Sequence, residues 1–313
     1  MKSVKRIILI SLLAIAMIPV SCTRQDKVKP TKNVILMVPD GTSTSVLSVV
    51  RWYRQHQNPQ NGTVTLATDP YLCGLVRQNC SDSPIAASPA AMTSFMTGYK
   101  AQGSNLSVYP ARNEGQDLVN VNADSTWQPL STVMEAAKIL GHKSTGLVVT
   151  VIATHATPGA TTAHTVSRSD NYNIIRQMAS NRVDVVFGGG VNYMDDDVKS
   201  ILDDNGISYI EKDVPAFRAA DKAPVWSLFS DEDMAFDLDR DTLAEPSLCE
   251  MTEKALSLLS KDKNGFFLMV EGSKVDYAAH SNDPMGVISE YDAFDKAVAV
   301  AMDFAKKDGN TTV

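Results

Sequence analysis

Short apolar runs alternate along the chain with segments of helical periodicity. The apolar runs occupy residues 34–38, 147–152, 183–187 and 266–270, and helical patterns lie near residues 43–57, 130–140, 171–179, 253–259 and 285–306. Strand-forming runs that alternate with helices in this way predict a parallel sheet covered on both faces. We therefore expect an α/β fold, a three-layer sandwich in which helices lie on both sides of a mostly parallel central sheet.

Three segments depart from this alternation. Residues 62–79 and 105–122 are interpreted as insertions, and the less regular residues 206–241 as a peripheral subregion. The chain shows no internal repeat and no long low-complexity tract. We interpret residues 33–313 as one domain that carries these additional segments.

The last residues predict a further strand. The turn Asp308-Gly309-Asn310 is followed by Thr311-Thr312-Val313, which is β-branched and apolar. Three residues are short for a sheet strand. We expect on this ground that the domain is incomplete at its C-terminus.

The first 21 residues predict a signal peptide. Lys2, Lys5 and Arg6 precede the apolar run 7–20, which is too short to span a bilayer comfortably. The sequence Pro-Val-Ser-Cys at residues 19–22 resembles a bacterial lipobox, although Pro takes the place where Leu is usual. Cleavage there would leave Cys22 as a lipidated N-terminus in contact with membrane lipid, with residues 22–32 as a tether. The alternatives are plain secretion and an uncleaved anchor. We expect an exported protein of the cell envelope, a periplasmic or outer-membrane lipoprotein.

Composition excludes some functions. The 313 residues are 44% hydrophobic and 21% charged, which is ordinary for a globular protein. Removal of residues 1–21 removes three basic groups and no acidic ones, so the formal charge changes from −7 to −10. No block of Lys and Arg remains, which argues against nucleic acid as a main partner. Cys73 and Cys80 are candidates for a disulfide that leaves Cys249 over, and the absence of a Cys-x-x-Cys pair argues against a thiolate zinc site.

Oxygen ligands follow three of the apolar runs. Asp40 follows residues 34–38, Thr157 follows residues 147–152, and Glu271 follows residues 266–270 directly. Ligands of open α/β sheets bind outside the carboxyl ends of the strands. We expect Asp40, Thr157 and Glu271 to converge on one hard cation.

The segment after Glu271 adds two further metal donors. Asp276 and His280 are four residues apart at the start of an expected helix, so they lie on one face of it. An Asp–His pair suits zinc, and carboxylate oxygen suits magnesium. The alternative interpretation is a strand-to-helix turn with a solvated histidine.

Ser88 is a candidate nucleophile. Ser88-Pro89 is typical of an N-cap followed by the first helical residue, and Gly98 would end this helix. A cap alone explains the serine. The same position also suits phosphate chemistry, because a helix N-terminus attracts anions and a metal ion lowers the pKa of a serine hydroxyl that binds it.

Four motifs in this order resemble the alkaline phosphatase family. They are KNVILMVPDG at residues 32–41, IAASPAAMT at residues 85–93, the segment 155–168 and the segment 271–280. The order and spacing of these motifs agree with those of the family from Lys32 to the last residue. The resemblance implies the fold expected above, two zinc sites and one magnesium site, and hydrolysis of phosphate monoesters through a phosphoserine intermediate in a catalytic domain that can form a homodimer.

The resemblance also implies a role for each matching residue. Ser88 takes the position of the phosphorylated serine, and Arg168 that of the arginine that grips two oxygens of the substrate phosphate. Asp40 takes the position of the aspartate that bridges magnesium and one zinc. The remaining matches are metal ligands: His155 and Thr157 in the magnesium segment, Glu271 for magnesium, and Asp276 and His280 for the other zinc.

The chain departs from the family pattern at two places. Ala87 stands where the family usually has Asp beside the nucleophile, and Ser83 repeats the Ser-Pro dipeptide, although Ser88 has the family's spacing of ten residues from Gly98. The downstream Asp-His pair and later histidine that complete the zinc sites have no counterpart. Of the five histidines, His56, His142, His155, His164 and His280, only the last matches a zinc position. We expect a magnesium site but incomplete zinc sites, with two protein ligands each.

Three functions stay open on the sequence. The first is a zinc- and magnesium-dependent phosphomonoesterase. The second is a related enzyme with the same metal scaffold that acts on phosphodiesters or sulfate esters. The third is a non-catalytic envelope lipoprotein that binds phosphate, which Ala87 and the missing ligands favour for this chain.

Overall fold

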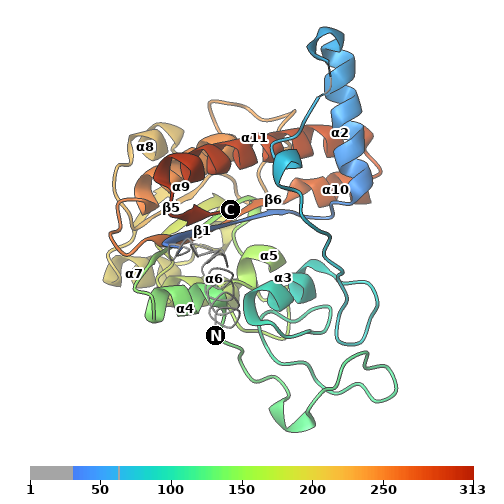
Figure 1. The fold of residues 1–313 in the computed structure, drawn as a ribbon. Helices are drawn as coiled ribbons and strands as arrows, with labels where there is room; N and C mark the ends of the chain where they lie inside the picture. The colour runs from blue at the N-terminus through green and yellow to red at the C-terminus, as the bar shows by residue number, and fades with distance from the viewer. Residues whose placement is uncertain (1–30, 63) are drawn as a thin grey trace, which may run out of the picture. The chain divides into compact units, whose positions relative to one another are not determined.

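A computed structural model describes residues 31–62 and 64–313 (Figure 1). The expected signal peptide at residues 1–21, Cys22 and most of the tether lie outside the described residues. Within those residues, no helix combines the length and the apolar character needed to cross a membrane.

The described residues form one seven-stranded parallel sheet. Its strands are β1 (Asn33–Pro39), β2 (Ser144–Ile152), β3 (Val185–Gly189), β4 (Ser208–Glu211), β5 (Val225–Leu228), β6 (Phe266–Gly272) and β7 (Thr311–Thr312). Their order across the sheet is β4-β5-β3-β2-β6-β1-β7, and every neighbouring pair is parallel. Strand β6 is the sixth in sequence, yet it lies between β2 and β1 in the interior of the sheet.

Helices cover both faces of the sheet, which confirms the expected three-layer sandwich (Figure 1). On one face lie α2 (Thr44–Gln57), α8 (Val214–Ala219), α9 (Leu248–Leu259), α10 (Lys274–His280) and α11 (Pro284–Asp308). On the other lie α3 (Ser88–Thr97), α4 (Val133–Ile139), α5 (Ala156–Gly159), α6 (Asn171–Ser180) and α7 (Asp196–Asp204).

The sequence of β6 explains why the sheet has two apolar faces. Phe266, Leu268 and Val270 pack into the core beneath α9 and α11, and Phe267 and Met269 pack into the core on the opposite face. Successive side chains of a strand point to opposite faces, so a continuous apolar run needs a cover on each side. All five side chains are buried.

The interpretation of residues 206–241 as a peripheral subregion is wrong. This segment supplies β4 and β5, which pair with each other and with β3 and so extend the central sheet. The expected strand at the end of the described chain is confirmed, since β7 pairs with the start of β1. Cys73, Cys80 and Cys249 are free.

Candidate active site

Three adjacent strands bring the sequence-predicted residues to one edge of the sheet. β2, β6 and β1 are consecutive and run in the same direction. Val38 on β1 is opposite Glu271 on β6, and the Asp40 N–H donates to the Gly272 carbonyl at 3.2 Å. Because the carboxyl ends of parallel strands meet at the same edge, Asp40, Glu271 and the turn after β2 lie together.

Asp40, His155 and Glu271 form a compact cluster of metal donors. One donor atom from each residue lies within 4.8 Å of the other two. Glu271 is fully buried, His155 is 8% exposed, and Thr157 on the short helix α5 is 2% exposed. The hydroxyl of Thr157 lies against the carboxyl group of Glu271. The three strand ends thus converge as the sequence predicted, with His155 inside the group.

Two buried polar atoms in this cluster have no hydrogen-bond partner. They are Oε1 of Glu271 and Nδ1 of His155. The other carboxylate oxygen of Glu271 accepts a hydrogen bond of 2.6 Å from the Ser273 hydroxyl. Buried polar atoms without a partner are rare, because each loses the hydrogen bonds that water would make. The free Oε1 of Glu271, an acceptor in an acidic cluster, is suited to coordinating a cation.

The electrostatics of the cluster also favour a cation. Burial raises the pKa of Glu271 to about 8, and the negative charge of Asp40 adds to this effect. Burial likewise raises the pKa of Asp40, and the negative charge of Asp276 raises it further. The hydrogen bond from Ser88 acts in the opposite direction. Burial, and then the positive charge of Arg168, lowers the pKa of His155 to about 4, so its imidazole is neutral at pH 7.

Ser88 lies beside this cluster as the first residue of α3. The expectation that Ser88 is the N-cap is wrong by one residue, because Ala87 takes that position and Ser88 already has helical geometry. Its hydroxyl makes no cap and donates instead to Asp40 Oδ2 at 3.0 Å. The Ser83 hydroxyl, in contrast, is engaged within its own loop, where it donates to the Ile85 carbonyl at 3.1 Å. The geometry thus distinguishes Ser88, which contacts the donor cluster, from Ser83, which bonds its own loop.

Arg168 reaches the cluster from the loop after α5. Its Nη2 donates to Nε2 of His155 at 2.7 Å, which requires a lone pair on that ring nitrogen. The ring of Tyr277 packs edge-on against the same imidazole, with centroids 5.9 Å apart. Burial, and then Asp233, raises the pKa of Tyr277. Asp233 also accepts a hydrogen bond of 2.8 Å from the Ile152 N–H at the end of β2.

Asp276 and His280 lie on one face of α10, as their spacing predicts. His280 Nε2 is 3.4 Å from Asp276 Oδ2. Asp276 packs against Gly41, whose φ of +59° is a left-handed conformation that favours glycine. The His280 side chain is 79% exposed, so this pair is at the surface beside the buried cluster.

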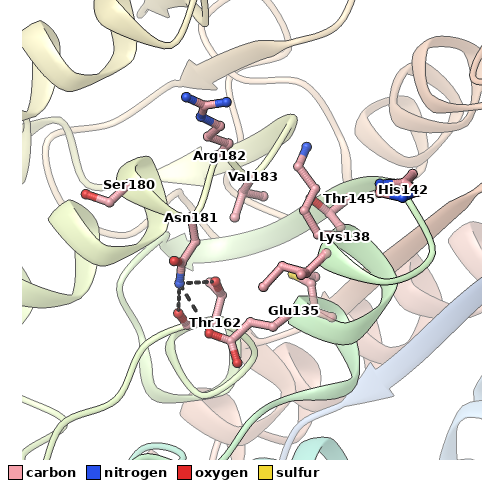
Figure 2. A pocket seen from close by; sticks show the side chains of 11 residues that line it. Glu135, Lys138, His142, Thr145, Thr162, Ser180, Asn181, Arg182 and Val183 are labelled. Carbon is pink, nitrogen blue, oxygen red and sulfur yellow. Dashed lines mark hydrogen bonds between the residues drawn. The ribbon is translucent and has the colours of Figure 1, made fainter.

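The other three histidines lie away from the cluster. His164 is held by Glu135 and by the Ser107 carbonyl, and His56 is in the last turn of α2. His142 lines a cavity of about 350 Å³ beside α4 and the amino ends of β2 and β3, together with Lys138 and Arg182 (Figure 2). This cavity is at the opposite edge of the sheet from Asp40 and Glu271, because it adjoins the starts of the strands.

Sequence reasoning missed Ser273, Tyr277 and Asp233. Ser273 and Tyr277 belong to a segment that the sequence singled out, but neither is a metal-ligand type. Asp233 comes from an irregular loop after β5. Its spatial relation to the end of β2 has no local signal, because 81 residues separate the two partners.

Comparison with known proteins identifies similar proteins over almost the whole described chain. A sequence profile described as alkaline phosphatase matches residues 31–313. Alkaline phosphatase 4 of Bacillus subtilis (strain 168) is 34% identical over 304 residues, which cover 94% of this chain and 62% of that protein. The chain spans about three fifths of the length of the first two curated relatives.

Solved structures show the same similarity. The cold-active alkaline phosphatase of the psychrophile Shewanella sp. has a TM-score of 0.79 and 29% identity, covering 89% of this chain and 66% of that one. A TAB5 alkaline phosphatase variant, with one histidine replaced by aspartate and described with Mg bound in the M3 site, has a TM-score of 0.75 and 30% identity. That match covers 90% of this chain and 76% of the TAB5 chain.

Proposed function

Because the chain belongs to the alkaline phosphatase family, we propose that it hydrolyses phosphate monoesters through a phosphoserine intermediate at a site that holds divalent cations. One observation carries the proposal. The Ser88 hydroxyl, at the first turn of a helix, donates to Asp40, which is itself part of the buried donor cluster. A serine placed against metal ligands is suited to nucleophilic attack, whereas a serine that only caps a helix bonds its own backbone.

The buried cluster fits a magnesium ion. Asp40, Thr157 and Glu271 offer oxygen donors, and His155 offers a nitrogen donor beside them. The unpartnered Oε1 of Glu271 is the atom that an ion would satisfy. A bound divalent cation stabilises negative charge on phosphoryl oxygens and lowers the pKa of a hydroxyl that it coordinates. In support, Mg is named for the similar TAB5 structure.

The two zinc sites fit less well. Among residues 31–62 and 64–313, Asp40 with Ser88 and Asp276 with His280 each give two protein donors. Catalytic zinc sites have three protein ligands and structural ones have four. We therefore derive no catalytic step through zinc from these residues.

The protein groups of the site have distinct roles in the proposed reaction. Asp40 holds the Ser88 hydroxyl in place, and the amino end of the ten-residue helix α3 attracts the phosphate of the substrate. Ser88 Oγ attacks phosphorus and the bond to the alcohol breaks, which leaves a phosphoserine that water hydrolyses. Arg168 turns from His155 to two phosphate oxygens, because its guanidinium fork matches a phosphate. Ala87 offers no carboxylate to fix that arginine, so the clamp is looser than in the family pattern.

The test compares three substrates on the full chain. With zinc and magnesium present, we expect p-nitrophenol to be released faster from p-nitrophenyl phosphate than from bis-p-nitrophenyl phosphate or p-nitrophenyl sulfate. We also expect mass spectrometry of protein quenched in acid with substrate to place a phosphoryl group on Ser88. Preference for the diester or the sulfate, or a modification at Ser83, would contradict the proposal. The test compares ratios of the three rates, because incomplete zinc sites lower the rate on every substrate.

We also propose that the chain is exported to the cell envelope and anchored to membrane lipid through Cys22. The basic residues, the short apolar run and the lipobox-like sequence before Cys22 support this proposal. Incorporation of radiolabelled palmitate by the wild-type chain, and its loss in Cys22→Ala, is the expected result. Equal labelling of both would contradict it.

A further inference from the structure

Ser273 occupies the turn between β6 and α10, directly behind the metal-donor cluster. It is fully buried, and its hydroxyl donates to Oε2 of Glu271 at 2.6 Å. The Ser273 Oγ also accepts a hydrogen bond from the Thr150 N–H on β2, at 3.4 Å. The serine thus connects the neighbouring strand to a carboxylate two residues before it in sequence.

These contacts determine which oxygen of Glu271 is free. Oε2 faces Ser273, and Oε1 is the buried oxygen that has no partner. Because a carboxylate is planar, holding one oxygen fixes the direction of the other. The unpartnered Oε1 belongs to the residue that lies within 4.8 Å of the donors of Asp40 and His155.

The turn around Ser273 is closely packed. A side chain at Gly272 would collide with Phe294, since a Cβ atom there would lie 2.8 Å from its Cδ2. Glu271, Gly272 and Ser273 are all buried. The Ser273 hydroxyl is therefore confined to the space between β2 and Glu271, where water has no access to replace it.

We propose that Ser273 is a positioning residue that orients the Glu271 carboxylate for binding a divalent cation. The inference rests on the magnesium site proposed above and adds a residue that is not itself a ligand. Outer groups that hold a metal ligand through a hydrogen bond commonly change metal affinity by about 10- to 100-fold when they are removed. Without the hydroxyl, the Glu271 carboxyl group stays buried but loses the partner that fixes Oε2.

The test measures magnesium affinity by titration calorimetry on the full chain, without substrate or zinc. We expect Ser273→Ala to raise the dissociation constant of Mg²⁺ by about 10-fold or more. Ser227→Ala is the matched control, because Ser227 is an equally buried serine on β5 whose hydroxyl has no partner. The control should bind magnesium like the wild type. Melting of the metal-free proteins shows whether each variant is folded.

A second comparison separates orientation from general loosening of the fold. Glu271→Gln removes the ligand charge, and Ser273→Ala should add no further loss of magnesium affinity in that background, since the two residues act through one contact. Affinity within about twofold of the wild type in Ser273→Ala would overturn the proposal. So would an equal loss in Ser273→Ala and Ser227→Ala. If the wild type binds no magnesium, both this inference and the proposed metal site fail, whereas loss of the Ser273 effect alone leaves the metal site intact.

Discussion

At the scale of single residues, Ser88 is the side chain on which the proposed chemistry depends. In a chain whose zinc sites are complete, we expect Ser88→Ala to lower the rate of phosphate release by about three orders of magnitude, because no other group forms the covalent intermediate. The fold should be unchanged, since the hydroxyl caps no backbone group. Ser83→Ala is the control, as the Ser83 hydroxyl bonds only its own loop. Retention of more than about a tenth of the activity by Ser88→Ala would contradict its role.

The guanidinium group of Arg168 leads to a second prediction. Arg168→Ala should weaken inhibition by inorganic phosphate more than Arg168→Lys, because lysine keeps the charge but loses the planar fork. Inhibition constants for phosphate, measured with the same substrate for all three proteins, provide the comparison. Arg182→Ala, in the cavity of Figure 2 at the opposite edge of the sheet, is a control for a general loss of positive charge. Equal effects of the two Arg168 variants would mean that the fork has no role.

Asp40, Ser88 and Glu271 were predictable from sequence because each stands at a position with a local signal, the end of an apolar strand or the start of a helix. The hydrogen bond from Ser88 to Asp40 was not, because it joins residues 48 positions apart. Ser273 was missed for a related reason. The role of its hydroxyl depends on the residues that pack against the turn. A serine after a strand is common, and most such serines do not orient a carboxylate.

At the scale of elements, the contact between α4 and the loop that carries Arg168 depends on His164. Burial alone would lower the pKa of His164, but hydrogen bonds to Glu135 and to the Ser107 carbonyl raise it above its ordinary value of 6.5. Burial alone would raise the pKa of Glu135, but the His164 and Thr132 contacts lower it below 4.5. The raised histidine pKa stabilises the fold below pH 6.5 and this contribution is lost as the pH rises through the folded-state value. The lowered glutamate pKa contributes above pH 4.5.

This pair predicts a pH-dependent effect of His164→Asn. The variant should lower the free energy of unfolding by about 1–2 kcal/mol between pH 4.5 and 6.5, and by less at pH 9. Urea denaturation of the full chain across this range measures it. His142→Asn is the control, because His142 is exposed and has a φ of +49°, which asparagine tolerates. A difference that stays constant from pH 5 to 9 would show that the ion pair does not account for the stability.

The long elements were predictable, but of the two edge strands only β7 was, and β4 was not. β1, β2 and β6 are apolar over most of their length because both faces of each are covered. β4 has four residues, Ser208–Glu211, of which none is fully buried, so it has no apolar run for a sequence pattern to detect. The sequence pattern therefore indicates a peripheral segment, although pairing with β5 places it in the sheet.

At the scale of the whole molecule, the site exists because of the strand order. Helix and strand periodicity predicts a parallel sheet, but it does not predict that β6 lies between β1 and β2. That order brings Glu271 between Asp40 and the turn of His155, although they are separated by more than a hundred residues of chain. Long-range packing, and not any local pattern, decides this adjacency.

The final prediction follows from the contrast between the two kinds of metal site. The 313-residue chain should bind magnesium, because Asp40, His155 and Glu271 place donor atoms close together and the Thr157 hydroxyl lies against Glu271. At a concentration of 100 times the dissociation constant, magnesium should stabilise the fold by about 2.7 kcal/mol. We expect a raised melting temperature in magnesium, and its loss in Glu271→Gln. Phosphate release should nevertheless stay low with added zinc, since the described residues give two protein ligands to each zinc and three are needed. Rapid, zinc-dependent turnover would contradict this argument and would mean that ligands beyond Asp40, Ser88, Asp276 and His280 complete the zinc sites.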